Sequence, residues 1–208
     1  MELSEALRRR RMTRRYDPGR PVPEGVLQAV LAAACRAPSA GFSQAVSLLV
    51  LTGEDREAYW SATAPGPATA PGPATEPGRW LAGMRTAPVL VTVWTSRAAY
   101  LDRYAEPDKG WTDRDPERWS APYWFVDAGM AVMAALLAAT DAGLGACFFG
   151  VPTGRIAAVR ETFGVPAEQL SVGVLSLGYA VAGGSPGSPA RRPRRPPDEV
   201  VHTGRWAG

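Results

Sequence analysis

Arginines crowd the beginning of this 208-residue chain. The stretch RRRRMTRRYDP starts at Arg8, and six of the eight positions from Arg8 to Arg15 are arginine. Such a run can bind nucleic acid, an anionic membrane surface or the phosphate of a small ligand, and a solvated terminus is a fourth alternative. Guanidinium groups bind phosphate oxygens in pairs of parallel hydrogen bonds, so a few converging arginines are enough to hold one phosphate.

Positive charge belongs to the two ends of the chain. The formal net charge is +3, yet residues 21–190 hold ten Arg, Lys109 and 15 acidic residues and carry a net charge of −4. A nucleic-acid-binding domain usually spreads basic and aromatic residues across one face of its body. The acidic body therefore argues against nucleic acid as a partner, and we expect none.

Few side chains in the sequence could act as catalysts by themselves. His202 is the only histidine, and Cys35 and Cys147, both in apolar surroundings, are expected to be buried thiols. This set offers no metal-ligand spacing, so we expect no metal site. The only lysine lacks the P-loop pattern, and GLGACFFG runs from a helix into a strand, the reverse of a dinucleotide fingerprint. If the protein is an enzyme, a bound cofactor must carry its chemistry.

Hydrophobic periodicity and turn residues predict the elements that position these groups. In chain order they are helix 24–37, strand 46–53, strand 88–96, helix 123–145, strand 146–150, helix 153–164 and strand 171–180. Helices and strands are intermixed without strict alternation, which favours an α+β fold. Helix 123–145 is apolar on nearly all faces, so we expect it in the middle of the fold.

We expect a single domain over residues 1–208, with two long irregular segments. A loop rich in Pro, Gly and Ala lies near 62–79 and contains APGPAT twice, from Ala64 to Thr75, and an extended arm covers 183–208. The longest apolar stretch, Ala128–Thr140, is shorter than the roughly 20 residues of a membrane span, so no membrane segment is expected. The beginning of the chain has no apolar signal segment, which predicts a cytoplasmic protein.

Three segments taken together resemble the FMN-dependent nitroreductase family. They are the arginine run RRRMTRRYDP, the turn APSAGFSQ from Ala37 to Gln44, and the final RRPRRPPDEVVHTGRW. The resemblance implies a fold with a central mixed or antiparallel sheet surrounded by helices. It further implies an intertwined homodimer with two FMN molecules at the subunit interface, reduced by NADH or NADPH.

The resemblance implies that two arginines meet the FMN phosphate or ribityl chain and that two more reach the same phosphate. Arg10 and Arg14 would come from the beginning of the chain, and Arg192 and Arg194 from its end. Met12 stands where the family usually has Ser, so only a backbone contact is expected there. No catalytic side chain is implied, because N5 of the flavin carries the chemistry.

Further flavin contacts are implied at the turn and after strand 146–150. They are Pro38, Ser39, Phe42, Gln44, Phe149 and Gly150. The turn residues are expected to reach the flavin of the partner subunit, and Gly150 to place a backbone N–H near N5. Phe42 replaces a usual Asn and would add an apolar wall. Asp127, within the apolar helix, is expected to be a buried structural hydrogen-bonder.

The implied reaction is hydride transfer from NAD(P)H to FMN, followed by reduction of a nitroaromatic, quinone or enone acceptor. Substrate oxidation or flavin fragmentation remains an alternative, because PSAGF resembles the branch of the family that makes the lower ligand of cobalamin from FMN. The basic tail favours an ordinary reductase. A nucleic-acid-binding module is the alternative from another class.

Overall fold

The strand β2 (Val89–Ser96) lies inside a four-stranded sheet in the computed structural model, which describes residues 1–64, 77–181 and 192–206. Every residue of β2 is buried, because the sheet is covered on both faces. The strand order is β1-β2-β4-β3, with β1 at Val46–Leu51, β3 at Gly145–Phe149 and β4 at Gln169–Gly178. All three pairings are antiparallel, which confirms the expected α+β architecture.

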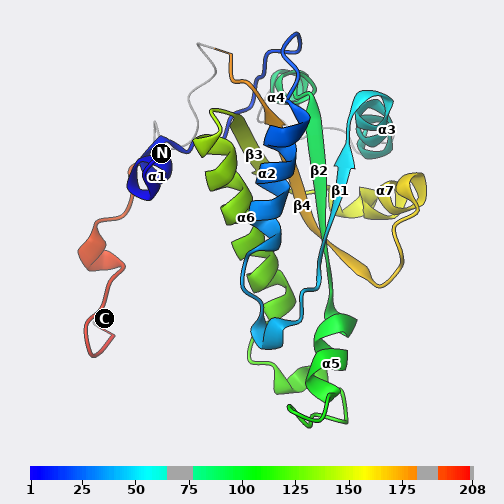
Figure 1. The fold of residues 1–208 in the computed structure, drawn as a ribbon, viewed down its shortest axis with the longest axis vertical. Coiled ribbons are helices and arrows are strands. Elements are labelled where there is room, and N and C mark those ends of the chain that lie inside the picture. The colour runs from blue at the N-terminus through cyan, green and yellow to red at the C-terminus, as the bar shows by residue number, and fades with distance from the viewer. Residues whose placement is uncertain (65–76, 182–191, 207–208) are drawn as a thin grey trace.

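Helices pack on both faces of the sheet (Figure 1). On one face α2 (Glu24–Cys35) and α6 (Tyr123–Asp141) pack on each other and on the strands. On the other face lie α3 (Gly53–Thr63) and α7 (Ile156–Phe163). The alternation of side chains along β1 divides its leucines between the two cores, with Leu48 on the α6 side and Leu49 on the α7 side.

The structure corrects one expectation about α6, which is not buried all round. Its inner face is buried through residues such as Ala131 and Ala135, but Phe125, Val126 and Met130 on the outer face are between 39% and 46% exposed. By length and composition α6 alone among the described helices could cross a membrane. It packs against β2, β3 and β4, so we interpret it as a core helix with one apolar face left open.

Several short helices were not predicted from the sequence. They are α1 (Leu3–Arg9), α4 (Pro77–Met84), α5 (Arg97–Ala105) and the 3-10 turns η1 (Ala40–Phe42), η2 (Pro116–Arg118) and η5 (Pro197–Glu199). The 3-10 turn η3 (Thr153–Arg155) forms the first part of the predicted helix 153–164. The expected loop 62–79 is therefore shorter, because α3 reaches Thr63 and α4 begins at Pro77. Residues 65–76, which hold nearly all of the APGPAT repeat, lie outside the described residues, as does 182–191 of the arm.

The two cysteines differ in burial. Cys147 in β3 is buried as expected, and burial raises the pKa of its thiol. Cys35 is exposed, which corrects the prediction. It follows the buried Ala34 in α2, and one residue turns a helix by about 100°, enough to leave the packed face.

Tyr16 fixes the segment that follows α1 to the sheet. Its side chain is buried, and its hydroxyl donates to the Thr13 carbonyl oxygen at 2.6 Å and lies 2.7 Å from the Ser176 hydroxyl in β4. Burial raises the pKa of the Tyr16 phenol, so it stays neutral. The Tyr16 backbone also forms an isolated antiparallel bridge with Ala180. The arginine run is thus a fixed part of the fold.

Candidate functional site

The part of the arginine run that follows α1, Arg10–Arg15, is called the arginine segment below. It lies along the outer edge of β3. Met12 forms a parallel bridge with Ala146, and the Thr13 N–H donates to the Ala146 carbonyl oxygen at 2.8 Å. Gly145 permits this approach, since a Cβ there would stand 2.7 Å from the Thr13 hydroxyl. The Met12 sulfur lies 3.5 Å from the Phe148 N–H, so its side chain is used in packing. The implied backbone contact of Met12 with FMN stays a prediction.

Arg10 differs from its neighbours in having a buried donor without an acceptor. Its Nη1 is buried and has no hydrogen-bond partner among the described residues. By contrast, Arg9 forms an ion pair on the surface of α1, and Arg11 donates to the Arg10 carbonyl oxygen at 3.0 Å. Arg14 makes a long bond of 3.3 Å to a backbone carbonyl. A buried cationic donor left unpaired is costly, so Arg10 is suited to an anionic ligand.

Phe149 is the last residue of β3, the strand beside the arginine segment, and Gly150 follows it. The Phe149 ring stacks on Trp60 of α3 at 6.0 Å between centroids and meets the edge of Trp80 of α4 at 5.6 Å. Trp80 is 41% exposed, whereas Trp60 is buried with no partner for Nε1 among the described residues. Gly150 is exposed, and a Cβ on it would meet nothing within 4 Å. The backbone of Gly150 is therefore open to a flat ligand beside an aromatic wall.

The turn between α2 and β1 holds the second group of predicted residues. Gly41, Phe42 and Gln44 all have positive φ, at 61°, 56° and 49°. The Ser39 hydroxyl accepts from the Gln44 N–H at 3.0 Å and so closes the turn. Pro38, Phe42 and Gln44 are exposed. Left-handed backbone is strained for residues other than glycine and is often found at ligand sites.

Helices α5 and α6 clamp this turn. The buried carboxylate of Asp127 accepts from the Ala40 N–H at 2.7 Å and from the Tyr100 hydroxyl at 2.6 Å. Arg103 Nε donates to the Gly41 carbonyl oxygen at 2.7 Å. The interpretation of Asp127 as a buried structural hydrogen-bonder is confirmed, and the carboxylate holds the strained turn in place.

The arginine segment and the turn between α2 and β1 lie at opposite ends of α6. The turn is bound to Asp127 near the start of α6, while the N-terminal ammonium group of Met1 pairs with Asp141 at its last residue. At a rise of 1.5 Å per residue, these aspartates are about 21 Å apart along the helix axis. Figure 1 shows η1 and α5 at one end of α6 and α1 towards the other. One copy of the chain therefore does not bring the two groups together.

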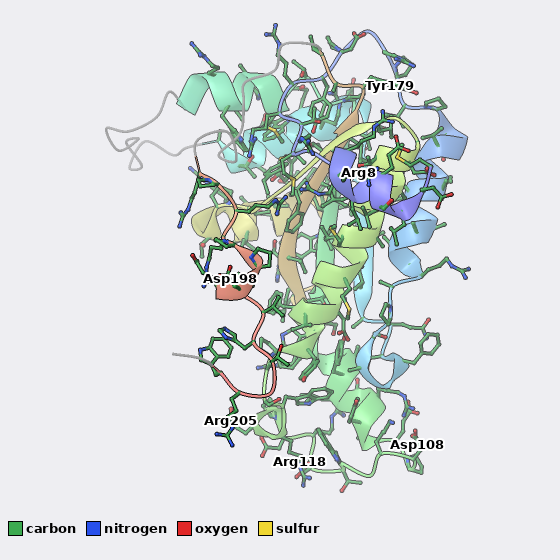
Figure 2. All side chains as sticks on the ribbon, turned by 90° about the vertical axis from the view of Figure 1, so that its left-hand side faces the viewer. Arg8, Asp108, Arg118, Tyr179, Asp198 and Arg205 are labelled. Carbon is green, nitrogen blue, oxygen red and sulfur yellow. The ribbon has the colours of Figure 1, made fainter. Side chains whose placement is uncertain are left out.

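The described part of the arm stands apart from the body (Figure 1). Arg192 and Arg194 are exposed and make no hydrogen bond or ion pair with the described residues, and Arg195 pairs with Glu199 at 3.1 Å. The convergence of Arg192 and Arg194 with Arg10 thus stays a prediction. Figure 2 shows the arm running from Asp198 to Arg205 across one side of the molecule.

Sequence reasoning missed Arg103 and Tyr104, which support the turn. A Cβ on Gly41 would stand 2.6 Å from the Tyr104 ring, so the ring packs directly on the turn backbone. Tyr104 also meets Trp119 at 4.4 Å in an aromatic cluster that fixes the irregular segment 106–122 onto the body. Tyr100, Arg103 and Tyr104 share one face of α5 at i, i+3 and i+4, a spacing that could have revealed them.

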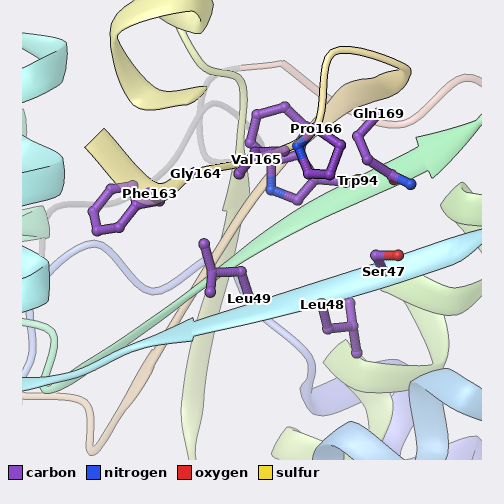
Figure 3. A pocket seen from close by; sticks show the side chains of 9 residues that line it. All are labelled: Ser47, Leu48, Leu49, Trp94, Phe163, Gly164, Val165, Pro166 and Gln169. Atoms are coloured by element: carbon purple, nitrogen blue, oxygen red, sulfur yellow. The ribbon is translucent and has the colours of Figure 1, made fainter. Parts of the chain in front are cut away.

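A groove of about 280 Å³ lies between the edge strand β1 and the end of α7, and it holds none of the predicted site residues (Figure 3). It is lined by Ser47, Leu48, Leu49, Trp94, Phe163, Gly164, Val165, Pro166 and Gln169. These residues come from the outer strand β1, from β2, and from the stretch that runs from the end of α7 to the start of β4. The groove is therefore separate from the two groups described above.

Comparison with known proteins identifies the family. The profile of the nitroreductase family matches residues 7–179. The chain belongs to the nitroreductase family. The matched range of this nitroreductase-family protein includes Arg10, the turn at Ser39 and Gly150, and it ends before the arm. Membership makes the protein an oxidoreductase by family.

Relatives of this family member span nearly its whole length. A Methanothermobacter thermautotrophicus protein named as an NADH dehydrogenase/NAD(P)H nitroreductase is 27% identical over 208 residues, covering 99% of this chain and 88% of that protein. A Desulfovibrio desulfuricans nitroreductase, whose structure was solved in complex with FMN, is 23% identical in sequence. The two structures superpose with a TM-score of 0.69 over 100% of this chain and 99% of that chain. An FMN- and NADPH-dependent nitroreductase of Sphingopyxis sp. strain HMH is 24% identical, with a TM-score of 0.71 and full coverage of both chains. These structures share the fold.

Replacing Asp127 by Ala is expected to lower the free energy of unfolding by about 2–4 kcal/mol, because the buried Tyr100 hydroxyl and the half-buried Ala40 N–H lose their acceptor. Urea unfolding followed by tryptophan fluorescence measures the change. Tyr100→Phe is the matched control, which removes one donor and leaves the carboxylate bonded to Ala40, for a loss of about 1 kcal/mol. Wild-type stability in Asp127→Ala would show that the turn is not clamped through this carboxylate.

Proposed function

We propose that this protein is an FMN-dependent oxidoreductase that takes electrons from NAD(P)H and gives them to an electron-poor small molecule such as a nitroaromatic, quinone or enone. The observation that carries the proposal is the buried Nη1 of Arg10, which has no partner among the described residues, in a member of the nitroreductase family. A phosphate monoester carries close to two negative charges and fits a cluster of guanidinium donors. The FMN complex of the Desulfovibrio desulfuricans relative supports the same cofactor.

The residues of this chain would divide the tasks of holding the flavin. Arg10 and Arg14 bind its phosphate, and Arg192 and Arg194 supply further positive charge from the arm. Gly150 presents its backbone to the isoalloxazine ring. When bound, FMN supplies hydride exchange: NAD(P)H gives up a hydride and leaves as NAD(P)⁺, and the acceptor gains a hydride and a proton.

The aromatic wall beside Gly150 would exclude water from the reacting atoms. Phe149 packs against Trp60 on one side and Trp80 on the other, so this border of the site is apolar. A dry, shaped site favours hydride exchange between stacked rings, because no side chain needs to take part in bond making. The roles of the protein are thus binding, orientation and exclusion of water.

We further propose that the working unit is a homodimer formed through the open face of α6. Phe125, Val126, Met130 and Met133 make an apolar stripe of exposed side chains along this helix. Large exposed apolar patches of this kind mark interaction surfaces. If two copies of α6 pack antiparallel through the stripe, the start of one helix lies beside the end of the other. The turn of one copy then meets the arginine segment of the other.

The arm gives this dimer its intertwined character in the proposal. Val200 and Val201 are 55% and 67% exposed, and Trp206 is 84% exposed. An apolar arm that stands apart from its own body is suited to pack on a second copy. Such packing would also bring Arg192 and Arg194 to a fixed place.

Flavin fragmentation is the second candidate, and Phe42 in the PSAGF turn is the observation that favours it. The two activities differ in the fate of the cofactor. A reductase returns intact FMN after many turnovers in air with NADPH and a quinone, whereas a fragmenting enzyme consumes it. Chromatography of the flavin after turnover separates them.

Purified protein is expected to retain the yellow flavin absorbance, and Arg10→Ala combined with Arg14→Ala is expected to weaken FMN binding at least 100-fold. That factor corresponds to losing about 3 kcal/mol of charge-assisted bonding to phosphate. Flavin fluorescence titration measures it. Arg8→Ala combined with Arg15→Ala is the control, since both side chains are exposed. Equal FMN affinity in the two double variants would contradict the assigned phosphate site.

Met130→Glu is expected to give monomers, because it places a charge in the centre of the apolar stripe. Sedimentation velocity measures the mass of the particle, and FMN binding should fall together with dimer content. Ala157→Glu in α7 is the control, an exposed position on the other face of the sheet. A Met130→Glu protein that remains a dimer with full FMN content would show that α6 is not the interface.

A further inference from the structure

Phe42 combines an exposed aromatic ring with a strained backbone. Its side chain is 71% exposed, and its φ is 56°, in the left-handed region. This conformation is strained for a residue with a Cβ. Exposure of a single large apolar side chain is common, but strain persists only where the surrounding structure imposes it, and such strain gathers at ligand sites.

The structure around Phe42 imposes this conformation. The Phe42 N–H donates to the Ser39 carbonyl oxygen at 2.9 Å, and the Gly41 carbonyl oxygen accepts from Arg103 Nε at 2.7 Å. The Tyr104 ring packs on Gly41 so closely that a side chain there would collide with it. After Phe42, the Gln44 N–H donates to the Ser39 hydroxyl at 3.0 Å. The backbone on both sides of Phe42 is thus fixed, and the ring is presented from a rigid turn.

The turn that presents the ring, residues 38–44, carries no charged side chain of its own. The two charged groups that touch the turn already have partners, since Asp127 accepts two hydrogen bonds and Arg103 pairs with Asp108 through two bonds of 2.7 Å. A neutral ring therefore finds an apolar stacking partner here, and a charged substituent would lose hydration without gaining a counter-charge.

We propose that Phe42 selects neutral, fused aromatic acceptors by stacking on their ring at the flavin site of a second copy. The proposal rests on the function and the two-copy site proposed above. The family resemblance expects Asn at this position, so the preference would distinguish this chain from relatives with the amide. Phe42 transfers no proton or electron, and its role is to determine specificity.

The test compares kcat/KM for menadione, a neutral two-ring quinone, with kcat/KM for p-benzoquinone, which has one ring. Wild type, Phe42→Tyr, Phe42→Leu and Phe42→Asn are measured with NADPH as reductant. The ratio of the two values within one variant cancels changes in FMN content and in the reduction of the flavin. Loss of the aromatic face in the Leu and Asn variants is expected to lower the ratio about two- to tenfold, the effect of one aromatic pair. Phe42→Tyr keeps the ring and should keep the wild-type ratio.

The outcomes separate this inference from the function on which it rests. Wild-type protein that binds no FMN, or that fails to oxidise NADPH with either quinone, would overturn the proposed function. An active wild-type enzyme whose ratio is the same in all four proteins would overturn the role of Phe42 alone. A fall of the ratio in Phe42→Tyr equal to that in Phe42→Leu would also overturn it, because stacking would not be the cause. Flavin content and thermal unfolding of each variant identify any misfolded protein.

Discussion

The length of α6 sets the distance between the turn at Ser39 and the beginning of the chain. The helix carries the clamp for the turn near its start and meets the N-terminal ammonium group at its last residue, about 21 Å away. The turn and the arginine segment, which the family resemblance assigns to one flavin site, are therefore held apart within a single chain. The apolar stripe from Phe125 to Met133 lies between them. Symmetric packing through this stripe would bring the parts together twice, once at each end.

Both parts are built by hydrogen bonds that fix backbone, and the free groups on them are the ones suited to ligands. At the turn, Asp127 and Arg103 hold the backbone of Ala40 and Gly41 and leave Phe42 exposed. Beside β3, Tyr16 and the bridge at Met12 fix the arginine segment and leave Nη1 of Arg10 without a partner in the part of the chain that the structure describes. In each case the structure holds strain or an unpaired charge that a bound flavin and its acceptor would relieve.

The sequence could predict the elements with a strong periodic pattern. Helix α2, the strands β2 and β4, and the end of α7 at Gly164, whose φ is 61°, follow from apolar spacing and from a glycine stop signal. Helix α4 was not predictable, because PGRWLAGM contains a proline and two glycines and forms against the arginine segment. Helix α5 had a usable signal in Ser96, whose hydroxyl caps it by accepting from the Ala99 N–H.

The site residues could be predicted from the family resemblance but not from local sequence pattern. Resemblance gave the positions Arg10, Ser39 and Gly150, but no local pattern distinguishes Arg10 from Arg9 or Arg11, since only the folded chain decides which guanidinium is buried. Periodicity likewise showed that α6 is apolar all round and could not show which face remains open. Burial depends on contacts far apart in sequence, and these are absent from a local window.

Mixed dimers test the central claim, that each flavin site takes its arginine segment from one copy and its turn from the other. One chain carries Arg10→Ala and Arg14→Ala, the second carries Ser39→Ala and Gln44→Ala, and the two are co-expressed with different tags and purified as a heterodimer. The arrangement proposed here predicts one FMN per heterodimer, because one site combines the intact segment of the second chain with the intact turn of the first, and almost none in either parent homodimer. A heterodimer that binds no FMN, while the wild-type dimer binds two, would contradict it.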